Sequence, residues 1–320
     1  MKIGFIGSGN ISRFHIDALK NNNFSIEAIG TRNDSKNCFN IAKDFNLLNK
    51  YCSKGWKEVL EKKVDAFCLC IDIAETPDIL LEILDIGLPV LVEKPVAWQI
   101  KNLDNILNHP NKDKIFVGYN RRFYRTLNIL REKCDSSVEG GTILVNIPDP
   151  VLGVKQFLSN GCHMIDSLRY LVGDFEIKDK LMKFDKNKND ILSITALCKS
   201  EKFDILLNAH SLIPSNFSIT INNSDFVYEL KPLEKLTFFN GMEVIEPTTE
   251  EPIRRYIPRI ESSIVESSLF KPGFNEMYSS FNRFVSGNAI EQFCSIDDAK
   301  KTLQKCWDLI GSEMDLNLKN

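Results

Sequence analysis

A glycine-rich turn directly follows the first apolar segment of the chain. Residues 2–6 form a short apolar run, and the sequence GSGNIS over Gly7–Ser12 then opens an amphipathic stretch at 11–21. Gly7 permits a tight turn, and Gly9 lets backbone amides approach a phosphate whose charge the N-terminus of a helix favours. Ser12 replaces the third glycine of this pattern with another small residue. A strand before the turn and a helix after it predict dinucleotide binding rather than a bare turn.

Short apolar runs alternate with amphipathic stretches over the first third of the chain. This alternation is typical of βαβ units around a parallel sheet. Apolar residues at helical spacing predict helices over 11–21 and 78–86. The predicted strands are Lys2–Ile6, Ser25–Gly30, Ala66–Ile71, Val90–Val92 and Ile115–Gly118. We therefore expect an α/β chain whose N-terminal domain, residues 1–118, is a doubly wound Rossmann sheet that binds NAD(P).

The pattern changes after residue 118, and we expect residues 119–320 to form an α+β domain for substrate binding and oligomerisation. Helical segments near 121–134 and 161–172 precede a series of alternating strands, and 296–313 predicts a final helix. The alternation indicates a mostly antiparallel open sheet. Residues 248–272, rich in Ser, Glu and Pro, predict a mobile surface loop. The predicted strands are Gly141–Ile147, Asp190–Ser200, Phe203–Ser211, Phe217–Asn222, Phe226–Leu230 and Leu236–Asn240.

Charge and cysteine content exclude several classes of function. Lys and Arg number 40 against 43 Asp and Glu, a net charge of −3 without a basic block, so nothing favours binding to nucleic acid. No apolar run approaches the roughly eighteen residues of a membrane span, and no signal-peptide pattern opens the chain, so we expect a soluble cytoplasmic protein. The 9 cysteines form no C-x-x-C pair and the 4 histidines are dispersed, which indicates reduced thiols and no metal site.

The end of the second predicted strand bears on the choice of dinucleotide. NAD-binding domains place an acidic residue there for the ribose hydroxyls, whereas this chain has Thr31 and Arg32. Arg32 can pair with a 2′-phosphate and Thr31 can donate its hydroxyl, which favours NADP over NAD. In the alternative interpretation, Arg32 is a solvated surface charge and Asp34 supplies the missing acid.

A charged pair stands at the carboxyl end of the strand predicted at 90–92. Open α/β sheets bind ligands at this edge, and the strand is followed here by Glu93 and Lys94. A desolvated lysine can exchange a proton or polarise a hydroxyl or carbonyl group. An exposed lysine without function is the alternative.

A second group of polar residues lies in the predicted helical region near 161–172. Ser159 and His163 are four residues apart and would share a helix face, and Asp166 can reach the histidine or cap nearby backbone. A buried histidine satisfied within the core is the more common case, so His163 becomes a catalytic candidate only together with Lys94. His15, after the phosphate turn, is expected to be a packing or helix-orienting residue.

Four stretches together resemble a known enzyme family. They are the GSGNIS turn with His15, Glu93–Pro95, Val117–Phe123 and Gly161–Gly173. In this order the chain resembles the glucose–fructose oxidoreductase / inositol dehydrogenase / rhizopine-catabolism (Gfo/Idh/MocA) family of NAD(P)-dependent sugar oxidoreductases. The resemblance covers nearly the whole chain.

The resemblance implies hydride transfer between a nicotinamide and a CH–OH carbon of a sugar or sugar derivative, a nucleotide-linked one included. It implies that Lys94 and His163 handle the hydroxyl proton, that Glu93 serves the cofactor side or structural hydrogen bonds, and that the chain forms a homo-oligomer, a dimer or tetramer, through its C-terminal sheet. The cofactor-binding candidates are Gly7, Ser8, Gly9, Asn10, Ile11, Thr31, Arg32, Ile71, Glu93, Lys94 and Asn120.

The chain departs from the family pattern at positions that are expected to lie near the substrate. The aspartate that the family carries four residues before the histidine is Ser159 here, with Asn160 next to it, and the family's Thr-Pro-Asn is replaced by Ile71–Ile73. Asp72, within that replacement, is either a substrate contact or a helix N-cap. The candidate substrate residues are Asp72, Arg122, Ser159 and Asn160.

The loss of the aspartate leaves three interpretations open. His163 works without the carboxylate, Ser159 orients the substrate, or catalysis is weak or lost. The alternative function is therefore a catalytically impaired cofactor-binding regulatory or scaffold protein of the same fold. A reductase of a non-sugar carbonyl is a third hypothesis, because the fold constrains the hydride donor better than the acceptor.

Overall fold

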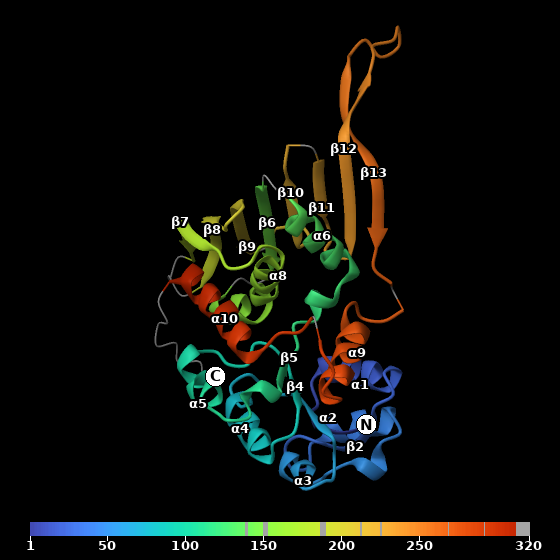
Figure 1. The fold of residues 1–320 in the computed structure, drawn as a ribbon, viewed down its shortest axis with the longest axis vertical. Helices are drawn as coiled ribbons and strands as arrows, with labels where there is room; N and C mark the ends of the chain where they lie inside the picture. Colours follow the sequence, from blue (N-terminus) through green and yellow to red (C-terminus); the bar gives the residue numbers. More distant parts are fainter. Residues whose placement is uncertain are drawn as a thin grey trace. The chain divides into compact units, whose positions relative to one another are not determined.

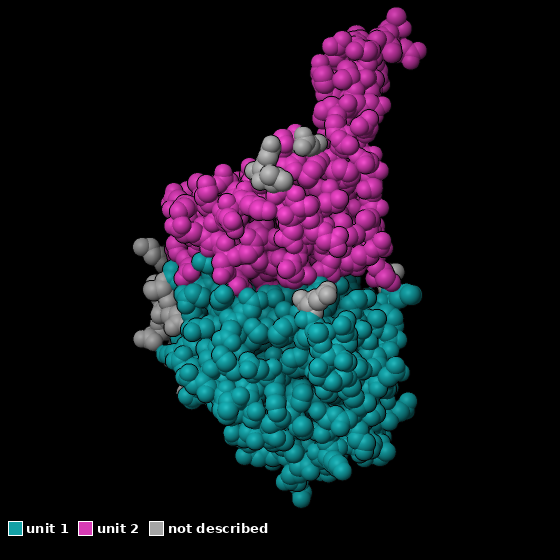
Figure 2. Space-filling view, in the orientation of Figure 1, with its two compact units in different colours: residues 1–123, 268–307, 311–320 teal, residues 124–267, 308–310 magenta. Residues whose placement is uncertain are grey.

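The computed structural model describes residues 1–137, 140–149, 153–185, 190–211, 213–224, 226–267, 269–290 and 292–311, and it divides into two compact units (Figures 1 and 2). The first unit holds Met1–Phe123 and the described residues of Ser268–Trp307, with Gly311; the second holds the described residues of Tyr124–Ser267 and Asp308–Ile310. The division therefore differs from a single cut after residue 118, because the chain returns to the first unit near its end.

The described part of the first unit contains a five-stranded parallel sheet with the order β2-β1-β3-β4-β5. Every residue of β3, β4 and β5 is buried, as expected for parallel strands that are covered on both faces. The predicted Rossmann sheet is confirmed. The strands are β1 (Lys2–Gly7), β2 (Ser25–Gly30), β3 (Ala66–Cys70), β4 (Val90–Val92) and β5 (Ile115–Val117).

Helices connect these strands at the predicted places. The stretches predicted at 11–21 and 78–86 are helical as α1 and α4. Among the described residues, no helix combines the length and the apolar character that crossing a bilayer requires. The helices with residues in the first unit are α1 (Asn10–Asn21), α2 (Lys36–Asp44), α3 (Trp56–Leu60), α4 (Thr76–Ile86), α5 (Asp104–Leu107), α9 (Phe274–Val285) and α10 (Ile296–Ile310), and short 3₁₀ turns lie at Leu48–Lys50, Ile100–Leu103, Lys112–Lys114 and Asn120–Phe123.

Helix α9 joins the core of the first unit through its aromatic residues. Tyr278 and Phe281 are fully buried. The Phe281 ring stacks on Phe24 with centroids 5.9 Å apart and meets Phe116 edge-on at 5.5 Å. Phe24 directly precedes β2 and Phe116 lies in β5, so α9 packs against residues from both ends of the parallel sheet. This packing explains why the chain returns to the first unit.

The second unit is built on an eight-stranded sheet with the order β13-β12-β11-β10-β6-β9-β8-β7. All neighbours are antiparallel except β6 and β9, which are parallel. The predicted, mostly antiparallel sheet is confirmed. The strands are β6 (Gly141–Asp149), β7 (Glu176–Phe184), β8 (Ile191–Lys199), β9 (Phe203–Ser211), β10 (Ser218–Asn222), β11 (Phe226–Leu230), β12 (Lys235–Ile245) and β13 (Arg255–Val265).

The prediction of a surface loop over 248–272 is wrong for residues 255–265, which form β13. Among the described residues this strand pairs with β12 alone, and the hairpin extends beyond the other strands of its sheet (Figure 1). Nearly every residue of β13 is exposed, so burial imposes no apolar alternation on the sequence. Pro258 is compatible with this position because an edge strand has no second neighbour that needs its missing N–H. β12 also runs past its predicted end at Asn240, through an irregular register near Phe239.

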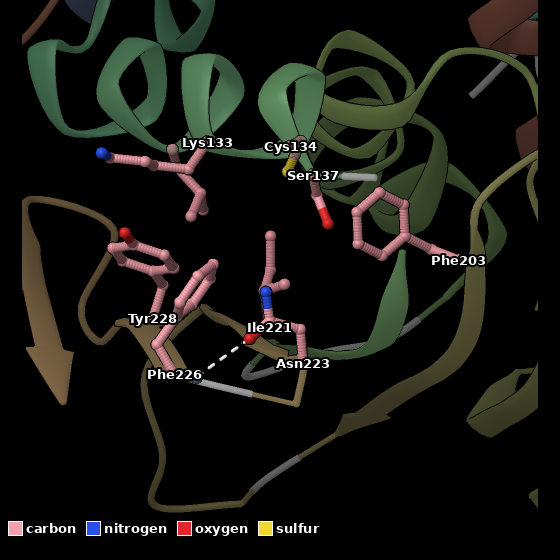
Figure 3. A pocket seen from close by; sticks show the side chains of 9 residues that line it. Lys133, Cys134, Ser137, Phe203, Ile221, Asn223, Phe226 and Tyr228 are labelled. Atoms are coloured by element: carbon pink, nitrogen blue, oxygen red, sulfur yellow. Dashed lines mark hydrogen bonds between the residues drawn. The ribbon is translucent and has the colours of Figure 1, made fainter. Parts of the chain in front are cut away.

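Helix α6 (Arg125–Ser136) packs on the sheet of the second unit. Figure 3 shows Cys134 of α6 facing Phe203, Ile221 and Tyr228 from the strands. The cavity left between them is about 10 Å³, roughly enough for one water molecule, so this space is core and no ligand site. The helical segments that follow β6 are α7 (Val154–Gln156), a π-helical turn (Phe157–Gly161) and α8 (Cys162–Val172).

Candidate active site

The glycine turn has the shape of a phosphate-binding loop. Gly7 has φ +153°, and a Cβ there would lie 2.3 Å from the carbonyl oxygen of Cys70, so only glycine fits. A Cβ added to Gly9 would meet no atom within 4 Å, which leaves open space beside the start of α1. No side chain of the described chain caps that helix. Its first N–H groups can therefore take an anion such as a pyrophosphate.

A pocket of about 270 Å³ adjoins the carboxyl ends of β2 and β3. Three predicted cofactor residues, Thr31, Arg32 and Ile71, line it. Trp56 and Glu75 were not predicted, and both line it as well. Trp56 is the first residue of α3, and its backbone N–H donates to the Thr31 carbonyl at 2.7 Å. The pocket therefore offers an aromatic wall and polar groups of the kind that bind a nucleoside.

Arg32 is paired inside that pocket. Its Nη2 lies 3.0 Å from Glu75 Oε1, and the two side chains are 73% and 46% exposed. Asp78 also lines the pocket, so two carboxylates stand near one guanidinium. Asp34, the alternative acid, lines a different pocket with Tyr51. Glu75 is thus the acidic residue that stands beside Arg32.

Glu93 is fixed at the end of β4 by a buried histidine. Its Oε1 accepts a hydrogen bond from His15 Nε2 at 2.8 Å, and its Oε2 accepts one from the Lys94 backbone N–H at 3.2 Å. Burial raises the pKa of Glu93, but the hydrogen bond and charge of His15 lower it below its usual range. Glu93 is therefore a carboxylate held in place next to Lys94 by His15, whereas sequence analysis predicted only a packing or helix-orienting role for that histidine.

The histidine belongs to a hydrogen-bonded cluster that continues into the core. His15 Nδ1 lies 2.7 Å from the hydroxyl of Tyr278, which is 3.0 Å from Cys68 Sγ. Burial opposes a charge on His15, but Cys68 and Glu93 raise its pKa to about 9. Helix α9 and strand β3 thus support Glu93 through His15.

Lys94 and Asp72 stand at the carboxyl edge of the parallel sheet, after β4 and β3. Lys94 is half-buried and precedes Pro95 through a cis peptide bond. Asp72 Oδ1 accepts from the Ala74 N–H at 2.9 Å, and its carbonyl accepts from the Thr76 hydroxyl at 2.9 Å. These bonds give Asp72 a local role in the turn before α4, but the N-cap interpretation is wrong because Glu75 is the N-cap residue of α4 and no described side chain caps that helix.

Asn120 and Arg122 are held by the chain itself. Asn120 Nδ2 donates to the Pro272 carbonyl at 3.0 Å. The Arg122 side chain, 6% exposed, pairs with Asp298 at 2.5 Å and donates to the Phe293 carbonyl at 3.1 Å. This buried ion pair accounts for Arg122 without a substrate.

The remaining candidates, Ser159, Asn160 and His163, lie in the second unit. Ser159 and Asn160 fall within the π-helical turn, a feature frequent at functional sites, and His163 is half-buried in the first turn of α8. The Ser159 hydroxyl donates to the Gln156 carbonyl at 3.2 Å. Asn160 Nδ2 donates to Asp149 Oδ2 at 3.2 Å, so a buried acid that sequence analysis missed anchors this turn.

Comparison with known proteins agrees with this geometry. Residues 1–120 match a family model described as an oxidoreductase family with an NAD-binding Rossmann fold. An inositol 2-dehydrogenase/D-chiro-inositol 3-dehydrogenase of Lacticaseibacillus casei is 25% identical over 185 residues, 54% of this chain and 54% of that protein. A glucose-fructose oxidoreductase domain-containing protein 2 of Xenopus tropicalis is 26% identical over 186 residues, 53% of this chain and 48% of that protein. The chain thus spans about half the length of the curated relatives that it matches.

Solved structures show the same fold over almost the whole chain. A dehydrogenase from Clostridium difficile superposes with a TM-score of 0.75 at 19% identity, covering 97% of this chain and 98% of that one. A myo-inositol dehydrogenase from Lactobacillus casei, in complex with NAD(H) and myo-inositol, gives 0.72 at 17% identity over 96% and 92%. A UDP-N-acetylglucosamine 3-dehydrogenase from Acidithiobacillus ferrooxidans gives 0.74 at 15% identity over 97% and 96%.

The two glycines of the turn predict opposite outcomes on substitution. In Gly9→Ala the added methyl group meets no protein atom, so the midpoint of thermal unfolding stays unchanged while binding of NADH weakens by about tenfold or more. In Gly7→Ala the methyl group collides with the Cys70 carbonyl, which lowers the free energy of unfolding by about 1–3 kcal/mol. Fluorescence titration with NADH and calorimetry measure the two effects. Unaltered cofactor affinity in a folded Gly9→Ala protein would contradict the loop assignment.

Proposed function

We propose that this chain, which belongs through residues 1–120 to the oxidoreductase family with an NAD-binding Rossmann fold, is a dehydrogenase of a sugar, polyol or sugar derivative. One observation carries the proposal: the Gly7–Gly9 loop and Lys94 follow parallel strands of one sheet, at the carboxyl edge where α/β enzymes bind ligands. The relatives named as inositol dehydrogenases support a hydroxylated, sugar-like substrate. Asp149 at the end of β6 and Asn160 in the π-helical turn of the second unit offer polar groups for such a substrate.

Lys94 and His163 are the proposed catalytic pair. The dinucleotide would be held by the Gly7–Gly9 loop and the pocket beside Thr31, and the nicotinamide, when bound, supplies the acceptor for the hydride that leaves the CH–OH carbon. Lys94, as the neutral amine, takes the hydroxyl proton as the carbonyl forms. His163 hydrogen-bonds the same oxygen, and the protonated Lys94 then releases the proton to solvent. Glu93, held by His15, positions the backbone of Lys94.

Lys94→Ala tests this role. Removal of a general acid or base costs about 10²–10⁴-fold in kcat, so we expect turnover with saturating cofactor to fall within that range. Because Lys94 is also a candidate cofactor contact, NADH affinity is measured alongside and is expected to fall less than turnover. Formation of reduced nicotinamide is followed with a panel of inositols, hexoses and nucleotide-linked sugars. Lys63→Ala, at an exposed lysine of the same unit, serves as the matched control and keeps full turnover.

A regulatory or scaffold protein without turnover is the second candidate. Its support is Ser159, which is no base and donates its hydroxyl to the Gln156 carbonyl. Tight binding of NADH by the wild-type chain with no turnover on any member of the panel, in either direction, would favour this candidate over the dehydrogenase.

For the cofactor we propose NAD(H) rather than the NADP favoured by sequence analysis. Arg32 is paired with Glu75, and Asp78 adds a second carboxylate to the pocket. A 2′-phosphate would bring about two negative charges next to them. A ribose 2′-hydroxyl can instead donate to Glu75, which takes the role of the acid missing after β2.

Glu75→Gln tests this preference. Wild-type chain is expected to bind NADH more tightly than NADPH. The substitution frees Arg32 and removes about 1 kcal/mol of repulsion at an exposed site, so the ratio of the two dissociation constants shifts about fivefold towards NADPH. Glu61→Gln, at an exposed acid of the same unit, leaves the ratio unchanged. A wild-type preference for NADPH would refute the assignment.

We further propose that a second copy of the chain covers the open face of the eight-stranded sheet, and that the protein acts in the cytoplasm. Three exposed leucines, Leu144, Leu206 and Leu197, stand opposite one another on β6, β9 and β8, with exposures of 41%, 38% and 54%. A continuous apolar row of this kind marks an interaction surface. The nine cysteines, none of which forms a disulfide, support a reducing compartment.

Light scattering on a sizing column tests the oligomer. The wild-type chain is expected as a dimer or tetramer, and the double substitution Leu197→Lys and Leu206→Lys as a monomer, because lysines cannot be buried unpaired in an apolar interface. Leu269→Lys, at an 84% exposed position of the first unit, leaves the mass unchanged. A monomeric wild-type chain would disprove the assembly.

A further inference from the structure

A buried imidazole and two buried thiols converge within the first unit. The ligand atoms of His15, Cys68 and Cys70 all lie within 4.8 Å of one another. Cys68 and Cys70 are two residues apart in β3, so both side chains point to the same face of the sheet, and their sulfur atoms are 3.5 Å apart. All three residues are at most 4% exposed.

The spacing of these atoms is close to that of a tetrahedral metal centre. Zinc has bonds of about 2.3 Å to sulfur and about 2.0 Å to nitrogen, so its ligand atoms lie roughly 3.3–3.8 Å apart. The two sulfurs already stand at 3.5 Å. The imidazole nitrogen, at up to 4.8 Å, needs to approach by about 1 Å, which a small rotation of a side chain provides.

The surroundings of His15 are those of a metal-ligating histidine. Such a histidine usually donates its other ring N–H to a carboxylate, which fixes the tautomer and orients the ring. His15 Nε2 lies 2.8 Å from Glu93 Oε1. With the proton on Nε2, the lone pair of Nδ1 points to the opposite side, where the Tyr278 hydroxyl is 2.7 Å away. That hydroxyl is also 3.0 Å from Cys68 Sγ and stands where the ligand atoms converge.

We propose that His15 Nδ1, Cys68 Sγ and Cys70 Sγ form a structural site for a thiophilic cation, with zinc as the foremost candidate and Tyr278 Oη as the fourth ligand. Thiolates with imidazole select zinc over the oxygen-seeking magnesium or calcium. Two thiolates balance the charge of a divalent ion, so the bound centre is neutral and compatible with the apolar core. Because the site is buried, the ion enters as the chain folds.

The site would join α1, β3 and α9 at one point, with Glu93 as the outer partner of His15. Its ligands touch no group assigned to the substrate, and metal retention is measured without turnover, so the site is tested separately from the proposed dehydrogenase activity to which His15 contributes through Glu93. Without a metal, the same atoms form a chain of hydrogen bonds from Cys70 through Cys68 and Tyr278 to His15. That metal-free network is the competing state in the experiment.

The full-length chain is unfolded in guanidinium, stripped with a chelator and refolded with cobalt(II) or zinc(II) chloride. We expect one metal per chain by elemental analysis after dialysis, and, with cobalt, the near-ultraviolet charge-transfer absorption of a thiolate-bound ion. Cys68→Ser and Cys70→Ser each weaken retention about tenfold or more. Cys134→Ser, at a buried cysteine of the second unit, retains the metal and the absorption.

A second measurement needs no variant, in case the cluster variants fail to fold. The wild-type chain refolded with zinc is expected to unfold at a higher temperature than the chain refolded in chelator, because the ion binds only the folded state. Equal unfolding temperatures, or cobalt retention without thiolate charge transfer, would overturn the proposal and leave the metal-free network as the state of the cluster.

Discussion

The close contact between the turn after β1 and the end of β3 is the constraint on which the first unit depends. Gly7 pairs with Cys70 across the sheet, and a side chain at Gly7 would collide with the Cys70 carbonyl. This approach lets the chain turn at once into α1. It also sets α1 over β3, so that His15, about one and a half turns along the helix, reaches Cys68 and Glu93. The tight turn at Gly7–Gly9 and the buried cluster are therefore consequences of the same missing side chain.

The parallel sheet could be predicted closely because burial on both faces leaves a strong trace in the sequence. Strands such as Ala66–Cys70 are continuous apolar runs, and the glycine turn marks where the first of them ends. β13 left no such trace, because solvent surrounds it and nothing selects its side chains for burial. The sequence also did not predict that α9 packs in the first unit. Its aromatic residues show that the helix has a core face, but they do not say which core it joins.

The site was predictable where backbone geometry dictates the residue, and less so where function depends on a partner distant in sequence. Gly7, Gly9 and Lys94 follow from their places at strand ends. The pairing of Arg32 with Glu75 does not, since 43 residues separate them, and it reverses the electrostatic argument for a 2′-phosphate. The cluster of His15, Cys68 and Cys70 could not be predicted either, because more than 50 residues separate the histidine from the cysteines. Metal sites that can be recognised from sequence have their ligands close together along the chain. Here the histidine comes from a helix and the two cysteines come from a strand.

The buried network also bears on how the carboxyl edge of the sheet at Lys94 keeps its shape. Glu93 and Lys94 follow a strand of only three residues, which by itself fixes little of what comes after it. The carboxylate of Glu93 is nevertheless held by an imidazole that α9 and β3 support in turn. Removing one member would leave a buried polar group unpaired, at a cost of about 1–3 kcal/mol. Because each member satisfies the next, the position of the Lys94 backbone depends on residues near both ends of the chain. The proposed dehydrogenase activity requires this arrangement, since proton transfer needs the amine to stay within hydrogen-bond reach of the reacting hydroxyl.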